Sequence, residues 1–218
     1  MNIFVVDEDP VIAARSLPDK LVVKMPTESM QMLAYWTSTR GFICKRQEGL
    51  AMVPYRMAKS HANHPCTKWV LESPNNGFWL YVHAMALCHE YTDRYKKVHA
   101  IEGHLLQVWD FMEENWDICL SVSWKKHTPF TQCVPPEYKG EDPIQVYRNF
   151  MIGEKGYAEW KHSKQPDWWD NEKFAATRAK YLLLREMKRQ AREQQRKRLW
   201  TGNGLSWVSS VRNFAITG

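Results

Sequence analysis

The chain has 218 residues, 44% of them hydrophobic and 25% charged, which is typical of a globular protein that buries a core. It contains no uncharged apolar run of about 18 residues, and its start, MNIFVVDEDP, has acidic residues where a signal peptide needs basic ones. We therefore expect an intracellular protein with no membrane partner.

The five cysteines are scattered and never form a CxxC motif. This spacing argues against a disulfide framework and against a finger-type zinc site. We expect neither a bound metal nor a cofactor.

The net charge of +6 comes from one segment. Residues 178–198 hold nine Lys or Arg against two Glu, a charge of +7 that leaves about −1 for the remainder. Such a segment could be an arm for RNA or DNA, a helix that binds a host protein complex, or a solvated extension.

The first third of the chain predicts short helices after an N-terminal arm. Residues 2–6 are apolar and β-branched, and Asp9-Pro10 is typical of a helix start. A second element runs from Asp19 until Pro26 interrupts it, and Pro26 opens the next helix with Glu28 in its first turn. In that position Glu28 is either a functional acid or only a helix-stabilising one.

The middle of the chain predicts a loop followed by the strongest helices. Residues 37–60 indicate a loop with a short hairpin around Gly41 and Gly49, and Pro65 starts a helix that ends near Ser73. The residues PNNG at 74–77 break it, and a long helix then spans 78–97.

The last part predicts two more core helices and an extension. A helix is expected over 100–118, a proline-rich loop over 125–143, and a further helix after Pro143. The fold class is mainly α, as a single multi-helix domain over 1–172 with a short arm, followed by a basic helix and tail over 173–218.

Histidine is concentrated in residues 61–97, where a metal site is one interpretation. However, His83 and His89 are six positions apart, so on one helix they point in nearly opposite directions. A metal-dependent enzyme is kept as an alternative, with ligands His61, His64, His83 and Glu90.

Basic residues in the chain alternate with Tyr, Trp and His, a composition that fits phosphate contacts and base stacking, although solvated helix faces have it too. The candidate nucleic-acid-binding residues are His61, Asn63, His64, Lys68, Trp69, His83, Glu90, Arg94, Lys97, Arg148, Arg189 and Arg192.

Three motifs carry a resemblance to known families. The pattern DxDPVxAAxxLxDKxVVKMxxExxQML, then HxNHPCxxWVxES and ALCxEYTxRYxKxH, resembles a family of uncharacterised bacteriophage proteins over about the first 165 residues. The chain is also distantly similar to pyrimidine-dimer DNA glycosylases of the phage endonuclease V type. This second resemblance rests on the order of four features: the arm, the glutamate-bearing helix, the HPxxKW segment and the EYxxRY helix.

This second resemblance implies a small all-α DNA enzyme. Its family uses the N-terminal amine as the nucleophile on C1′ of a damaged nucleotide, which is flipped out of the helix, and a glutamate assists. Here the resemblance places Glu28 at that glutamate, Lys20 and Lys24 near phosphates, and His64 with Trp69 near the flipped strand.

The chain departs from the family at its start, because Met1 precedes Asn2, which is too large for efficient methionine removal. The expected amine therefore belongs to Met1, Lys20 or Lys24. A non-enzymatic phage factor that binds nucleic acid or a host complex through 178–198 is the alternative.

Overall fold

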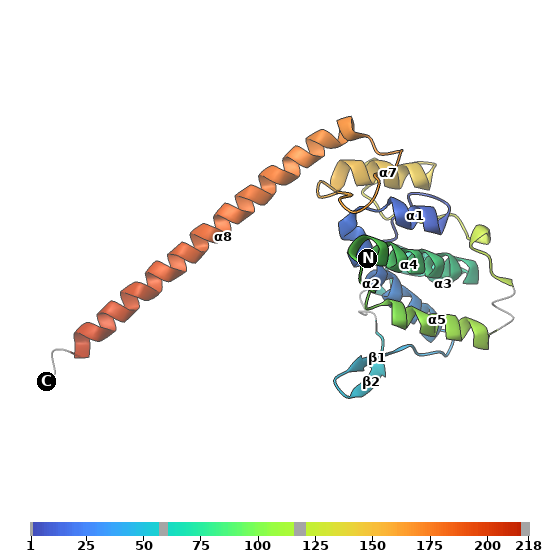
Figure 1. Ribbon diagram of the computed structural model, residues 1–218, viewed down its shortest axis with the longest axis horizontal. Helices are drawn as coiled ribbons and strands as arrows, with labels where there is room; N and C mark the ends of the chain where they lie inside the picture. Colours follow the sequence, from blue (N-terminus) through green and yellow to red (C-terminus); the bar gives the residue numbers. More distant parts are fainter. Residues whose placement is uncertain (1, 57–60, 116–120, 215–218) are drawn as a thin grey trace.

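The structure is a computed structural model that describes residues 2–56, 61–115 and 121–214, with side chains to Leu199. In this part of the chain it is mainly α-helical, as predicted, with one two-stranded sheet (Figure 1). The elements are α1 (Pro10–Ser16), α2 (Asp19–Ser38), β1 (Lys45–Glu48), β2 (Ala51–Pro54), α3 (Pro65–Glu72), α4 (Pro74–Tyr95), α5 (Glu102–Glu114), η2 (Trp124–Lys126), η3 (Pro136–Tyr138), α7 (Pro143–Glu154) and α8 (Asn171–Phe214).

Helix α4 is the centre of the core and packs against α1, α2, α3 and α5. Its buried side chains include Trp79, Tyr81 and Cys88, and the last two lie on the opposite side of the helix from Trp79. A helix that is apolar on several sides must be surrounded by other elements, which is the arrangement in Figure 1.

The predicted break at Pro26 is wrong, because α2 continues from Asp19 through Pro26 to Ser38. A proline inside a helix removes one backbone hydrogen bond and costs about 3 kcal/mol. Burial of Val22, Met25 and Met30 on both sides of Pro26 offsets that cost. Glu28 therefore lies in the middle of a helix, and the first-turn reason for its position does not apply.

The predicted end of the helix near Ser73 is confirmed, but residues 74–77 form the first turn of α4 and are not a break. Ser73 separates α3 from α4, and its hydroxyl accepts a hydrogen bond from the Asn75 backbone N–H at 3.1 Å. Pro74 then occupies the first helical position, where its missing N–H has no cost. Gly77 lies against the Trp36 ring, and a Cβ there would overlap that ring.

The sheet is a hairpin between α2 and α3, in which Lys45 pairs with Pro54 and Glu48 with Ala51. Gly49, in the turn, has a positive φ of 61° that favours glycine. A hairpin at Gly49 was predicted, whereas Gly41 precedes both strands.

The proline-rich loop predicted at 125–143 contains only η2 and η3, and side chains fasten it to the helices. The buried Asn76 amide donates hydrogen bonds to Trp69 O and Thr128 Oγ1, both at 2.7 Å, and accepts one from Thr128 N at 2.9 Å. This loop can therefore keep one conformation without regular secondary structure.

Helix α8 docks on the body only near its beginning. Tyr181 and Thr177 lie against Gly156, where a Cβ would overlap Tyr181, and Thr177 Oγ1 donates to Gly153 O at 3.2 Å. The helix then extends away from the body (Figure 1). It continues to Phe214, so the segment predicted as a tail after the basic helix is helical over 199–214. The boundary near 172 stays a prediction.

Among the described helices, none combines the length and the apolar character that a membrane span needs.

Candidate active site

Glu28 lies on a row of charged side chains along α2. Lys20, Lys24 and Glu28 are four residues apart, so they share one helix face. Lys24 Nζ pairs with Glu28 Oε1 at 2.8 Å, while the Glu28 side chain is only 15% exposed. A largely shielded carboxylate in this position can stabilise a positive charge that develops beside it.

The N-terminal arm brings the start of the chain to this carboxylate. The Asn2 backbone nitrogen donates to Glu28 Oε2 at 3.2 Å, across 26 residues of sequence. The Asn2 side chain fixes that position, since its Nδ2 donates to Cys133 O at 2.9 Å and its Oδ1 accepts from Tyr147 OH at 3.1 Å. Met1 itself lies outside the described residues.

His64 borders the same region from the start of α3. Its Nδ1 accepts the Cys66 backbone N–H at 3.2 Å, which caps α3. Burial lowers the pKa of His64, and the charge of Glu28 acts in the opposite direction.

Two residues that the sequence did not single out complete the site. Lys155 Nζ lies 4.3 Å from the centre of the Phe150 ring, and burial lowers its pKa, with a smaller contribution from nearby Lys24. Burial and then Glu28 raise the pKa of Tyr157, over whose ring Lys20 Nζ lies at 5.2 Å. No local pattern marks either residue. Both come from the segment after α7, which is distant in sequence from α2.

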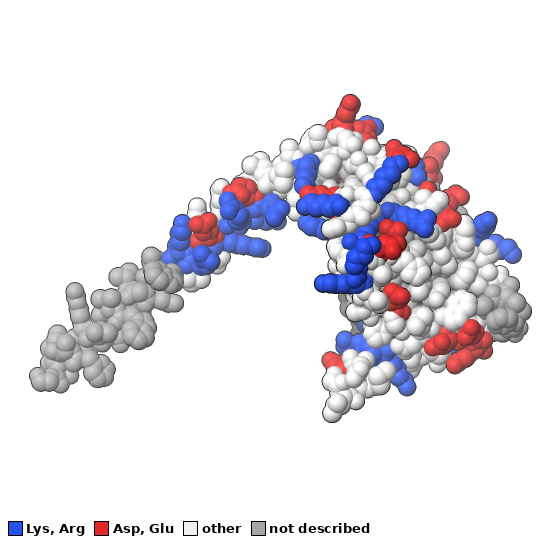
Figure 2. All heavy atoms as spheres, in the orientation of Figure 1, with Lys and Arg blue, Asp and Glu red and all other residues white. Residues whose placement is uncertain are grey.

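The lysines of the site lie on an open surface. Lys20 and Lys24 are exposed, and Lys20 Nζ donates to Tyr181 OH of α8 at 3.3 Å. Figure 2 shows Lys and Arg side chains along the side of the body that faces α8 and along α8 itself. The carboxylate is therefore beside a positively charged surface.

Three predicted nucleic-acid contacts are buried and have structural partners instead. Trp69 packs among the core aromatics and donates to Thr128 O at 3.3 Å. His83 is stacked on Trp79 at 5.1 Å with 1% exposure. Arg94 donates to Leu17 O, Arg15 O and Asp19 Oδ1 at 2.8 to 3.1 Å. These positions cannot contact DNA without unpacking the core, so the expectation is corrected for all three.

Two further candidates also connect parts of the fold. Glu90 Oε2 pairs with Arg94 Nη2 at 3.0 Å. Arg148 Nε donates to Val6 O at 2.8 Å, which holds the N-terminal arm against α7. The remaining candidates are half-buried (His61) or exposed (Asn63, Lys68, Lys97, Arg189 and Arg192).

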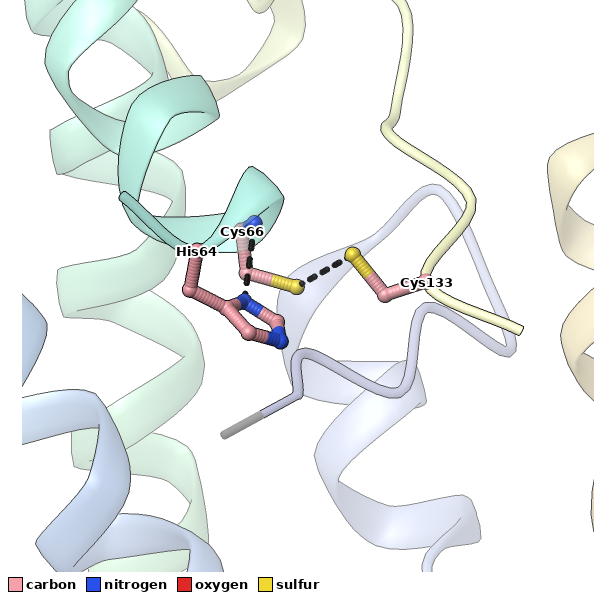
Figure 3. Close-up of side chains that lie close together, drawn as sticks. All are labelled: His64, Cys66 and Cys133. Atoms are coloured by element: carbon pink, nitrogen blue, oxygen red, sulfur yellow. Dashed lines mark hydrogen bonds between the residues drawn. The ribbon is translucent and has the colours of Figure 1, made fainter. Parts of the chain in front are cut away.

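The alternative metal site does not form among the described residues, because His83 is in the core and Glu90 pairs with Arg94. His64 instead lies close to Cys66 and Cys133, with ligand atoms within 4.8 Å of one another (Figure 3). Cys66 and Cys133 are 67 positions apart in the sequence, so no spacing motif could indicate this group.

The fold and the site define a helical protein with an acid next to the start of the chain and lysines around it. Residues 1–103 match the family model described as pyrimidine dimer DNA glycosylase. The first half of the chain thus has the distant resemblance to that family which its motifs predicted. No curated protein and no solved structure matches the chain.

Proposed function

We propose that the protein is a DNA N-glycosylase with lyase activity that acts on a damaged or modified base through an amine assisted by Glu28. The observation that carries the proposal is the 3.2 Å hydrogen bond from the Asn2 backbone nitrogen to Glu28 Oε2. The family match over residues 1–103 supports DNA as the substrate and a pyrimidine dimer as the first lesion to test.

The chemistry needs an amine and a carboxylate within reach of one sugar carbon. The amine attacks C1′, the bond to the base breaks with its electron pair, and loss of the ring C–O bond gives an iminium on the enzyme. Glu28 would stabilise the positive charge that develops on the sugar and move protons to and from the amine.

The start of the chain suits this role whether its first residue is Met1 or Asn2. If Met1 is removed, the Asn2 nitrogen that contacts Glu28 is the amine itself. In a chain that begins at Met1, only two carbon atoms separate the α-amine from that nitrogen, so the carboxylate is still near it. Lys24 and Lys20 are the competing amines on the same face of α2.

The exposed lysines would bind the DNA backbone. Lys20 and Lys24 flank Glu28, and phosphate contacts from such residues fix the position of a duplex without reading its sequence. We include exposed Asn63 and Lys68, near the start of α3, in this proposed surface.

Borohydride trapping tests the proposal directly. Duplexes that carry one thymine dimer or one abasic site are incubated with the protein, and a trapped iminium appears as a covalent protein–DNA complex on a denaturing gel. We expect Glu28→Gln to lower the rate of glycosidic-bond cleavage in the dimer duplex by about 100-fold, the scale of general acid–base assistance. Cleavage is read as strand scission, because the freed thymine stays joined to its partner in the dimer.

Glu113→Gln is the matched control, because Glu113 is an exposed helical glutamate on α5 that bonds only Trp109 Nε1 in the described part of the chain. Its rate should equal that of the wild type. No covalent complex with either duplex, or equal rates for Glu28→Gln and wild type, would contradict the proposal.

A second function is favoured by the shape of α8. Between residues 182 and 199, beyond its docked beginning, almost all side chains of the helix are exposed, and Lys and Arg side chains lie along it (Figure 2). Arg189 and Arg192 are among these exposed residues. The helix would serve as a nucleic-acid-binding arm, which adds affinity to the enzyme or acts alone if catalysis is absent. A non-enzymatic protein would bind duplex DNA in a salt-dependent way and give no trapped complex.

A further inference from the structure

A cluster of one histidine and two cysteines lies where three separate parts of the chain meet. His64 and Cys66 come from the start of α3, and Cys133 comes from the loop before α7. Asn2 of the N-terminal arm accepts a hydrogen bond from the Cys66 thiol and donates one to the Cys133 backbone carbonyl. Cys66 is fully buried, whereas Cys133 is half-buried. Figure 3 shows the two sulfur atoms facing each other and the His64 ring beside them.

The two thiols already interact as a pair. Cys66 Sγ donates to Cys133 Sγ at 3.1 Å, and this hydrogen bond lowers the pKa of Cys133 to about 7. The Cys133 backbone N–H donates to Tyr147 OH at 3.0 Å, which fixes the loop. The hydrogen bond to Cys133 and burial raise the pKa of the Cys66 thiol, so an ion that binds here must displace its proton.

We propose that His64, Cys66 and Cys133 form a binding site for a zinc ion. Two thiolates and one imidazole form a donor set that binds Zn²⁺ well, whereas Mg²⁺ and Ca²⁺ prefer oxygen ligands. This inference concerns ion binding only and does not rest on the proposed glycosylase function.

The distances suit this ion after a small movement. A tetrahedral ion with Zn–S bonds near 2.3 Å holds its sulfur ligands about 3.8 Å apart. The sulfur atoms at 3.1 Å would therefore separate by several tenths of an ångström, a shift that rotation of the half-buried Cys133 side chain can provide. The fourth position would take a water molecule or Asn2 Oδ1, which lies 3.7 Å from Cys66 Sγ.

Binding must replace two existing interactions. The thiol–thiol hydrogen bond is lost when both sulfurs release protons. A neutral imidazole has one free lone pair, and His64 now uses it to cap α3, so the ion and the cap compete for His64. An ion at this site would hold α3, the arm and the 121–142 loop together.

Cobalt substitution and zinc competition test the site in the full-length protein under reducing conditions and without DNA. Co²⁺ bound by thiolates in a tetrahedral site gives a sulfur-to-cobalt charge-transfer band and strong visible d–d bands. Competition with a chromogenic chelator then gives the zinc stoichiometry and affinity. We expect one ion per chain.

Two variants remove one ligand each with little risk to folding. Cys133→Ser changes a half-buried side chain, and His64→Asn keeps a residue that caps helices well. Because loss of even an outer-shell partner costs about 10- to 100-fold in affinity, each variant should bind zinc at least about 100-fold more weakly. Cys44→Ala, a buried cysteine outside the cluster, should bind as tightly as the wild type.

Three results would overturn the proposal. They are no stoichiometric binding of either ion, unchanged affinity in both ligand variants, and thiols that form a Cys66–Cys133 disulfide but bind no ion when reduced. The last result is read from the mass of the intact chain and from thiol counting. None of them bears on borohydride trapping, so this proposal and the proposed function can fail separately.

Discussion

His83 is a buried side chain whose polar atoms have no hydrogen-bond partner among the described residues. It is 1% exposed and stacked on Trp79, and burial lowers its pKa to about 3. A buried imidazole of this kind is neutral and acts as a flat aromatic in the core. Its prediction as a nucleic-acid contact followed from residue type alone, and residue type does not determine whether a helix face is covered.

The lowered pKa of His83 makes stability depend on pH in one direction. The unfolded chain binds a proton at His83 below about pH 6.5 and the folded chain does not, so stability is complete above 6.5 and is lost as the pH falls toward 3. Between pH 7 and pH 5 the loss is about 2 kcal/mol.

His83→Phe removes this dependence, because the new ring cannot be protonated. The free energy of unfolding of both proteins is measured by chemical denaturation at pH 7 and at pH 5. Between these pH values the wild type should lose about 2 kcal/mol more stability than the variant. Parallel pH profiles would show that His83 is not buried as described.

At the scale of elements, the helix content was predictable and the helix boundaries at prolines were not. The start of α1 at Asp9-Pro10 follows from local capping, since Asp9 Oδ1 accepts from Val11 N at 2.8 Å. Continuation of α2 through Pro26 depends on the burial of its side chains by elements that are distant in sequence. The local sequence pattern carries no information about that burial. That continuation aligns Lys20, Lys24 and Glu28 on one face, so the wrong prediction at Pro26 missed the fact that these three candidates share one helix face.

The close approach of α2 and α4 depends on Gly77. An Ala at this position would overlap the fully buried Trp36 ring, and such overpacking costs about 1–3 kcal/mol, partly offset by the better helix propensity of Ala. Gly77→Ala should therefore lower the free energy of unfolding by about 1–2 kcal/mol, measured by urea denaturation.

Gly103→Ala is the control for this change. Gly103 is also helical, on α5, and a Cβ there meets nothing, so the variant should be as stable as the wild type or more stable by up to about 1 kcal/mol. Equal effects at the two positions would mean that α2 and α4 do not pack as closely as described.

At the scale of the whole molecule, charge is distributed between a nearly neutral body and a basic helix. The total was predictable from sequence, as was the basic segment at 178–198. The direction of α8 was not, because it depends on the contacts of Thr177 and Tyr181 with Gly156. Assembly of the site also needed Cys133, Lys155 and Tyr157, which are distant in sequence from α2.

If α8 contacts the phosphates of bound DNA, its arginines should contribute to the salt dependence of binding. The double variant Arg189→Gln with Arg192→Gln removes two exposed cations, so the slope of log affinity against log salt should fall by about 2. Fluorescence anisotropy with a labelled duplex measures this slope. Lys139→Gln, an exposed lysine next to η3, is the control, and an equal slope in all three proteins would exclude α8 from the DNA interface.

The central claim is that the amine beside Glu28 is the nucleophile. It is tested most directly by locating the trapped adduct: the complex formed with borohydride on an abasic duplex is digested, and mass spectrometry identifies the modified residue. We predict that the adduct lies on the first residue of the chain, and that two residues added before it abolish trapping because they move the amine away from Glu28. An adduct on Lys20, Lys24 or Lys155, or full trapping by the extended chain, would contradict this account.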